Sequence, residues 1–393
     1  MKIKIAFLLF LLTCCGSPQA QTPPPPEQGP RPVPAAPQLG ATSYILMDFN
    51  SQRVLVESNA DLRVEPASIT KLMTSYVVYK ELASADISLD EKVAVSENAW
   101  RAEGSRTFID PSMSPTVEEL IRGMVIQSGN DASVALAEHV AGTEEAFAEL
   151  MNHYANELGL SGTHFLNATG LPDAEHYTTA RDIALLSAAI IREFPDYYAW
   201  YAEKEFTFNN IRQHNRNTLL WRDPAIDGLK TGHTQAAGFC LAASAMRDGM
   251  RLISVVMGSS SESVRASESQ GLLNHGFRFF ETVQLYQART ELARARVWKG
   301  VADEVTLGLA EPLFVTIPRG RYEDLDGQVE LQPQLSAPLA ADVVVGTMSV
   351  HLGDEVIAQR DLITLTAVES AGFFGRAWDG MRLWAGGFFS DEE

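Results

Sequence analysis

The sequence predicts an α+β protein with two folded domains, an antiparallel sheet with a helical region followed by an all-β domain of the sandwich class. Three observations lead to this expectation. The 393 residues are ample for two cores. Two strand pairs enclose a block of helical patterns in the first part of the chain. Beyond about residue 290, short apolar runs alternate with turn residues.

The first strand pair covers residues 42–49 and 53–58, which flank the turn residues Asn50-Ser51-Gln52. Next, Pro66-Ala67-Ser68 introduces an apolar helix from Ile69 to Leu82, with proline placed where a helix tolerates it. Further helical patterns cover residues 116–140, 144–158 and 179–193.

The second strand pair, residues 238–246 and 250–258, is separated by Arg247-Asp248-Gly249, and a helix is expected at 262–285. Because the two strand pairs come from both ends of this domain, we expect them to form one antiparallel sheet. In residues 290–366, Asp326-Gly327 and Gly353-Asp354 are expected as turns between strands.

Composition excludes several functions. A net charge of −19 and a pI near 4.9 argue against nucleic acid as a partner. No two histidines stand four apart on a plausible helix and there is no CxxC, so no metal site is expected. The glycine-rich motifs that bind nucleotides are also missing from the sequence. We therefore expect no cofactor.

The N-terminus is predicted to be a targeting sequence. Lys2 and Lys4 precede a short apolar run from Ile5 to Leu12, which is typical of a secretory signal peptide covering residues 1–20. A lipoprotein signal ending at Cys15 is the alternative. Residues 21–38 are rich in proline and are expected to form an extended linker.

The first chemical motif is Ser68 three residues before Lys71, which places both side chains on one helix face. A lysine on an apolar helix is desolvated, and its neutral amine can take a proton from the serine. An N-capping serine beside a solvated lysine is the structural alternative. Two further motifs favour the catalytic interpretation: Ser128-Gly129-Asn130 between helical patterns, and Lys230-Thr231-Gly232 on a strand.

In their order, these motifs are those of class A β-lactamases and penicillin-binding proteins. Residues 67–82, 126–139, 212–221 and 227–234 resemble the D-alanyl-D-alanine carboxypeptidases of the peptidase S11 family, the low-molecular-mass (class C) penicillin-binding proteins. The resemblance extends through residues 316–325 and 337–347 of the β domain. It implies a D,D-peptidase catalytic domain with the β-lactamase-like transpeptidase fold at 39–287 and a β-rich domain at 288–366.

The resemblance also implies roles for individual residues. Ser68 would be the acylated nucleophile and Lys71 its base, while Ser128 would relay a proton to the leaving D-alanine. The remaining implied residues bind substrate: Asn130, Arg216, Lys230, Thr231, Gly232 and His233. Asn130 would hold the substrate amide, and the Lys-Thr-Gly strand would pair with the substrate backbone, which Gly232 lets approach closely.

Charge recognition follows the same assignment. A substrate ending in D-alanine carries a carboxylate, which Lys230 and Arg216 would meet, the arginine with a two-pronged guanidinium. The oxyanion would lie between the backbone N–H groups of Ser68 and His233. Ser105 falls where the family has a loop bordering the cleft, although a plain surface serine is equally consistent.

The expected activity is removal of the terminal D-alanine from peptidoglycan pentapeptides, with covalent binding of β-lactams. In class A β-lactamases a glutamate stands four residues before an asparagine; here Thr163 precedes Asn167, which disfavours fast β-lactam hydrolysis. A D,D-endopeptidase, a weak β-lactamase and a non-catalytic cell-wall binding protein remain as alternatives. The intact motif set argues against the last.

Residues 367–393 are expected to form an amphipathic membrane-anchor helix. Phe374, Trp378 and Met381 fall on one stripe, while the charges of the segment prevent it from spanning a bilayer. Such a helix would lie in the membrane interface, and the resemblance implies the periplasmic side of the inner membrane. A helix packed back on the β domain is the alternative.

Overall fold

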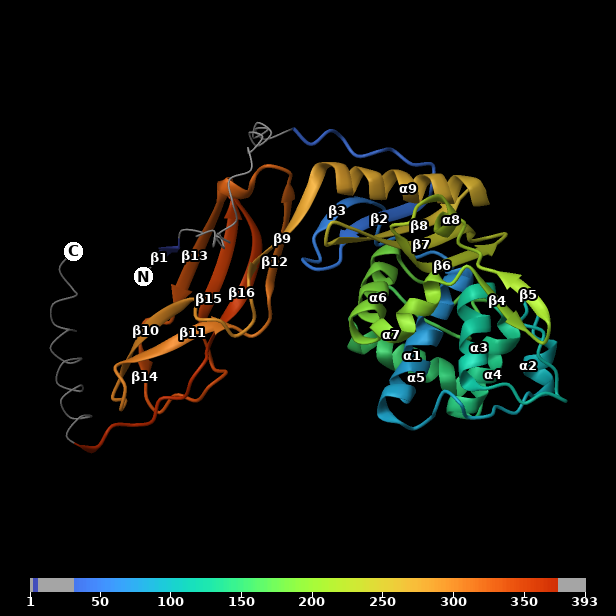
Figure 1. The fold of residues 1–393 in the computed structure, drawn as a ribbon, viewed down its shortest axis with the longest axis horizontal. Coiled ribbons are helices and arrows are strands. Elements are labelled where there is room, and N and C mark those ends of the chain that lie inside the picture. The colour runs from blue at the N-terminus through green and yellow to red at the C-terminus, as the bar shows by residue number, and fades with distance from the viewer. Residues whose placement is uncertain (1–2, 6–31, 374–393) are drawn as a thin grey trace, which may run out of the picture. The chain divides into compact units, whose positions relative to one another are not determined.

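The computed structural model describes residues 3–5 and 32–373 and divides the chain into two compact units (Figure 1). One unit runs from Pro34 to Phe279, and the other combines the described residues before Pro34 with those from Phe280 onward. The expected boundary at 287 lies later in the chain, because residues 280–286 are a strand of the second unit. Most of the predicted signal peptide and part of the predicted linker lie outside the described residues.

A single antiparallel sheet organises the first unit, in the strand order β3-β2-β8-β7-β6. The strands are β2 (Ser43–Asp48), β3 (Val54–Ser58), β6 (Ile226–Thr234), β7 (Gly238–Arg247) and β8 (Met250–Ser259). The register Ser43↔Met257 joins the first hairpin to the second, so the predicted sheet built from both ends of the domain is confirmed. β6, which carries Lys-Thr-Gly, lies at the edge of the sheet.

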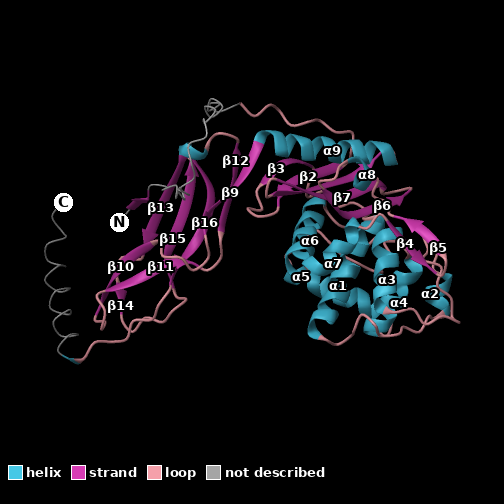
Figure 2. Ribbon diagram, viewed as in Figure 1, coloured by secondary structure: helices cyan, strands magenta, loops and turns pink. Residues whose placement is uncertain are grey.

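Helices cover both faces of this sheet (Figure 2). α9 (Glu262–Phe279) packs on one face, and a helical block packs on the other. The block contains α1 (Lys71–Ser84), α2 (Glu97–Arg101), α3 (Val117–Arg122), α4 (Asn130–Ala141), α5 (Glu144–Glu157), α6 (Ala180–Glu193) and α7 (Pro195–Tyr198). A small hairpin, β4 (Glu205–Phe208) and β5 (Ile211–His214), and the short helix α8 (Leu219–Arg222) precede β6.

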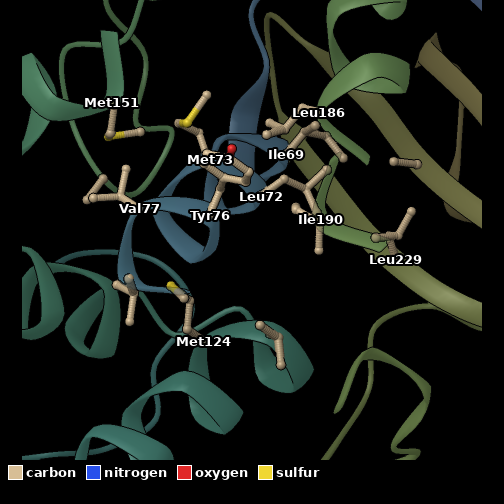
Figure 3. Packing of buried hydrophobic residues seen from close by; sticks show 14 of the residues in the cluster. Ile69, Leu72, Met73, Tyr76, Val77, Met124, Met151, Leu186, Ile190 and Leu229 are labelled. Carbon is tan, nitrogen blue, oxygen red and sulfur yellow. The ribbon is translucent and has the colours of Figure 1, made fainter. Parts of the chain in front are cut away.

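Helix α1 lies in the middle of the core. Leu72, Met73 and Tyr76 of α1 are at most 2% exposed and pack with apolar side chains from the surrounding segments, among them Met151 and Leu186 (Figure 3). Every residue from Lys71 to Tyr79 is buried, because the helix is enclosed on all sides rather than on one stripe. Whatever stands at its first position is therefore removed from water.

Two expected helices differ from the structure. The helix expected at 116–140 is interrupted, since α3 passes into a π-helical turn at Gly123–Gln127 and α4 begins only at Asn130. The helix expected at 262–285 ends at Phe279, and Phe280–Tyr286 forms β9, which pairs with β12 (Leu313–Pro318). Pairing with a distant strand overrides the local helical pattern there.

The second unit is an all-β domain, as predicted. A seven-stranded sheet has the order β1-β13-β15-β16-β11-β10-β14, and β9 and β12 form a second sheet. Its strands are β1 (Ile3–Ile5), β10 (Ala293–Trp298), β11 (Glu304–Leu309), β13 (Leu325–Leu331), β14 (Leu335–Ser336), β15 (Val344–Leu352) and β16 (Glu355–Thr364). Gly353-Asp354 forms the expected turn between β15 and β16. Asp326-Gly327 does not, because it pairs with β15 inside β13.

Most of the predicted anchor segment, residues 374–393, lies outside the described residues. Its first residues are not helical as expected, because Val368 and Ser370 form isolated bridges with Leu339 and Gly300. Among residues 3–5 and 32–373, no helix combines the length and apolar character needed to cross a bilayer.

The loop before α6 contacts the turn that carries Ser68 so closely that only glycine fits at position 170 of the loop. Gly170 has φ +84°, and a Cβ there would stand 1.8 Å from the carbonyl oxygen of Ala67. Gly142 at the end of α4 has a similar φ of +81°, but a Cβ there would meet nothing within 4 Å.

We predict that Gly170→Ala destabilises the first unit by about 2 to 4 kcal/mol, through steric overlap in addition to backbone strain. Gly142→Ala carries only the strain, about 1 kcal/mol. Thermal unfolding followed by helical circular dichroism measures both. Equal losses of stability in the two variants would show that the turn at Ala67 can shift to accommodate the added Cβ with little loss of folding free energy.

Candidate active site

Ser68 and Lys71 meet at the start of the buried helix. Ser68 lies in a 3-10 turn, Ala67–Thr70, which continues directly into α1 at Lys71. Lys71 Nζ is 3.1 Å from Ser68 Oγ. The spacing predicted from the sequence is thus a direct contact, and the serine is half-buried while the lysine is fully buried. The alternative of a solvated lysine is excluded by this burial.

Lys71 has two further contacts, each at 2.6 Å: Asn130 Oδ1 and the carbonyl oxygen of Thr169. A neutral amine has two N–H groups and one lone pair. The two N–H groups match these two acceptors, and the lone pair is left to accept the hydroxyl proton of Ser68. The contact geometry accommodates a neutral Lys71 that receives a hydrogen bond from the serine, as well as an ammonium that donates to all three oxygens.

Electrostatics favour the neutral form. Burial lowers the pKa of Lys71 to about 7, although the carboxylates of Asp131 and Glu144 oppose this shift. Asp131 accepts hydrogen bonds from the backbone N–H groups of Thr107 and Phe108. Near neutral pH, a substantial fraction of Lys71 is therefore uncharged.

The Ser128-Gly129-Asn130 motif fills the interruption between α3 and α4. Ser128 ends the π-helical turn with φ +71°, and its buried Oγ has no hydrogen-bond partner among the described residues. A Cβ at Gly129 would stand 2.1 Å from Thr107 Oγ1, so only glycine allows this approach. Asn130 then begins α4, where its Nδ2 donates to the Glu103 carbonyl at 2.5 Å and its Oδ1 faces Lys71.

Edge strand β6 supplies Lys230, Thr231 and Gly232. Lys230 is 2% exposed, and its Nζ donates to the Thr231 carbonyl at 3.1 Å. A Cβ at Gly232 would stand 2.9 Å from the Pro66 carbonyl and 3.1 Å from the backbone nitrogen of Ile69. The close approach that requires this glycine is between β6 and the Ser68 turn, rather than only with a substrate as the sequence suggested.

The pKa of Lys230 lies well below its ordinary value, because the side chain is buried and Lys71, Arg265 and Arg216 are nearby. These basic side chains around one space disfavour one another's charge, and a bound anion would relieve this, so the site is prepared for an anion.

Arg216 is held between two buried asparagines. Asn215 Nδ2 donates to the Tyr201 and Glu203 carbonyls, and Asn217 Nδ2 donates to the Gly228 carbonyl at 2.9 Å. The exposed Arg216 Nη2 reaches Ser105 Oγ at 3.2 Å. Ser105 thus belongs to the site's border, and the surface-serine alternative does not hold.

A cleft of about 470 Å³ joins these groups. Six predicted residues line it: Ser68, Ser128, Arg216, Thr231, Gly232 and His233. The other three, Lys71, Asn130 and Lys230, are buried. The exposed His233 ring lies 4.0 Å from the Phe239 ring, centre to centre. No group of metal-ligating side chains occurs in the part of the chain that the structure describes.

With this geometry established, comparison with known proteins identifies the family. The family model for the peptidase S11 D-alanyl-D-alanine carboxypeptidases matches residues 31–261. The chain belongs to this family. The C-terminal domain of penicillin-binding protein 5 matches residues 280–370.

Similar proteins cover between 61% and 90% of this chain. The D-alanyl-D-alanine carboxypeptidase DacC of Escherichia coli is 47% identical over 90% of this chain and 92% of its own length. Penicillin-binding protein 5 of Haemophilus influenzae has a crystal structure with a TM-score of 0.83, at 43% identity, covering 86% of this chain and 99% of that one. Penicillin-binding protein D2 of Listeria monocytogenes, solved with ampicillin bound, is 30% identical and has a TM-score of 0.57, covering 61% of this chain and 98% of that one.

Thr163 occupies the position that supplies a glutamate in class A β-lactamases, and in this member of the carboxypeptidase family it holds the loop in place instead. Thr163 Oγ1 donates to Asp182 Oδ2 at 2.6 Å, and Asn167 Oδ1 accepts from the backbone N–H groups of Thr169 and Gly170. Asn167 therefore shapes the loop that presents the Thr169 carbonyl to Lys71.

Sequence reasoning missed four residues that line the cleft: Gly104, Phe239, Glu262 and Arg265. Arg265 is 5% exposed, and its Nη1 donates to the Gly232 carbonyl at 3.2 Å. No motif marks Glu262 and Arg265, because α9 reaches the cleft only through the packing of that helix on the sheet. Phe239 lies on β7, beside His233 of β6.

Proposed function

We propose that this chain is a serine-type D-Ala-D-Ala carboxypeptidase that removes the terminal D-alanine from peptidoglycan pentapeptides through an acyl-enzyme on Ser68. The observation that carries the proposal is the buried Lys71 amine, 3.1 Å from Ser68 Oγ at the base of a cleft bordered by cations. The names of the relatives support the same reaction.

In the acylation step, Ser68 Oγ attacks the carbonyl carbon of the penultimate D-alanine while its proton passes to Lys71 Nζ. The backbone N–H groups of Ser68 and His233 stabilise the oxyanion. The peptide C–N bond then breaks, and the unpartnered hydroxyl of Ser128 relays a proton to the departing D-alanine amine. Ser128 regains its proton from Lys71, which returns to the neutral form. Water hydrolyses the ester and releases the shortened peptide.

Lys230 and Arg216 recognise the terminal carboxylate in this scheme. Burial and neighbouring cations lower the pKa of Lys230 in the free protein. A bound carboxylate restores the charged form, because an opposite charge stabilises the ammonium. The two cations favour a substrate with a free terminal carboxylate over the internal cross-link of an endopeptidase.

Asn130 serves both Lys71 and the substrate in this proposal. Its amide oxygen lies 2.6 Å from Lys71 Nζ, so it orients the base as well as holding the substrate amide. Thr231 and Gly232 lie on an edge strand, to which an extended peptide can add as a further strand.

β-Lactams would acylate Ser68 in the same way and leave slowly. The loop from Thr163 to Asn167 holds no carboxylate that could activate water as in class A β-lactamases. The protein therefore acts as a covalent penicillin binder and at most as a weak β-lactamase.

For location, we propose the periplasmic face of the inner membrane. The support comes from the sequence: a signal peptide at residues 1–20 and an aromatic, amphipathic segment at 367–393.

The first test compares acylated D-Ala-D-Ala peptides that end in a free carboxylate or an amide. We expect Arg216→Gln and Lys230→Gln each to lower kcat/KM for D-alanine release from the acid peptide. This loss should be about tenfold greater than the loss in kcat/KM for D-alaninamide release from the amide peptide. Ser68→Ala, the control, should release no D-alanine and bind no fluorescent penicillin. Equal losses on both peptides would show that the two cations do not recognise the carboxylate.

The second test concerns the anchor. Ser370 still pairs with Gly300, and the Ala371 N–H donates to the Lys299 carbonyl, so the chain is best cut after Phe373. We predict that this truncated protein keeps full activity and leaves the membrane fraction. Continued sedimentation with membranes, or loss of folding, would refute the anchor.

A further inference from the structure

Arg265 is positioned at the cleft by helix α9. It belongs to the first turns of the helix, is 5% exposed, and lies with its guanidinium carbon 5.6 Å from the centre of the Phe239 ring. One side of the guanidinium is bound to the sheet, because Nη1 donates a hydrogen bond to the Gly232 carbonyl on β6. The other side, Nη2, points to Glu262.

Glu262 is the sole acidic side chain among the described residues that line the cleft. Its Oε1 is 3.2 Å from Arg265 Nη2, and its side chain is 54% exposed. The carboxylate is therefore held by one partner at the cleft wall while it remains in contact with water. Such an ion pair is weak and exchangeable.

Arg265 shares its surroundings with the cations already assigned to the terminal carboxylate. Both Arg265 and Arg216 act on the charge of Lys230, and Arg216 acts on that of Arg265. Glu262 thus places a negative charge at the edge of the space that the substrate's carboxylate is proposed to enter. The two carboxylates repel each other and seek the same type of donor.

We propose that Glu262 is a specificity-determining residue that competes with the terminal carboxylate of the substrate for Arg265. This inference rests on the proposed function, since it concerns the same end of the cleft. Arginine has five N–H donors in a rigid fork, so Nη2 can exchange Glu262 for the ligand while Nη1 keeps its bond to Gly232. An amidated ligand carries no charge and does not enter this exchange.

The test measures binding without turnover. In the Ser68→Ala protein, isothermal titration calorimetry gives the Kd of an acylated D-Ala-D-Ala peptide with a free carboxylate and of its amide. We expect Glu262→Gln, which keeps the shape and an acceptor oxygen, to lower the Kd of the acid about three- to fivefold and to leave that of the amide unchanged.

Glu291→Gln is the matched control. Glu291 pairs with Arg294 at the same three-residue spacing with a 48% exposed side chain, but it does not line the cleft, so neither Kd should change. Equal changes for acid and amide, or no change with Glu262→Gln, would overturn the competition. The binding test needs no cleavage, so it is independent of turnover. Charge-selective binding by the Ser68→Ala protein, together with no D-alanine release by the protein that keeps Ser68, would refute the proposed function alone.

Discussion

The removal of one lysine amine from water is the constraint on which the site depends. Lys71 begins a helix whose next eight residues are also buried, so its amine cannot reach solvent. Lowering its pKa from 10.5 to about 7 means that folding costs on the order of 5 kcal/mol at neutral pH relative to an unperturbed lysine. Because the unfolded chain holds this proton more tightly, the cost declines as pH rises from about 7 towards 10.5. The large apolar core around α1 offsets it.

The segments around Lys71 supply the hydrogen-bond partners that its buried amine needs in place of water. Its two N–H groups need fixed acceptors, which the α4 terminus and the loop before α6 supply through Asn130 and Thr169. The loop before α6 and the edge strand β6 approach the nucleophile turn so closely that glycine is needed at the contact points, Gly170 and Gly232. Gly232, which the sequence analysis assigned to the close approach of the substrate, therefore also allows β6 to pack against the Ser68 turn.

Patterns local in sequence predicted much of this architecture. The hairpins, the common sheet and the Ser68–Lys71 contact follow from alternation, turn residues and helical spacing. The helical pattern at 116–140 did not reveal the π-helical turn before Ser128, because such a turn carries no periodic signal, although the Ser128-Gly129-Asn130 motif was expected between helical patterns. β9 was predicted as helix because its partner β12 lies far along the chain. Arg265 and Glu262 escaped notice because only the packing of α9 on the sheet brings them to the cleft.

The pH dependence of acylation tests the central claim most directly. The rate constant for acylation by benzylpenicillin should fall with decreasing pH, with half its limiting value near pH 7, as Lys71 takes up a proton. Glu144→Gln should move this limb to lower pH, because the Glu144 charge raises the pKa of Lys71. Buried His176 has a pKa of about 4 and cannot account for such a limb. A rate constant that stays unchanged down to about pH 5 would contradict a neutral Lys71 as the base.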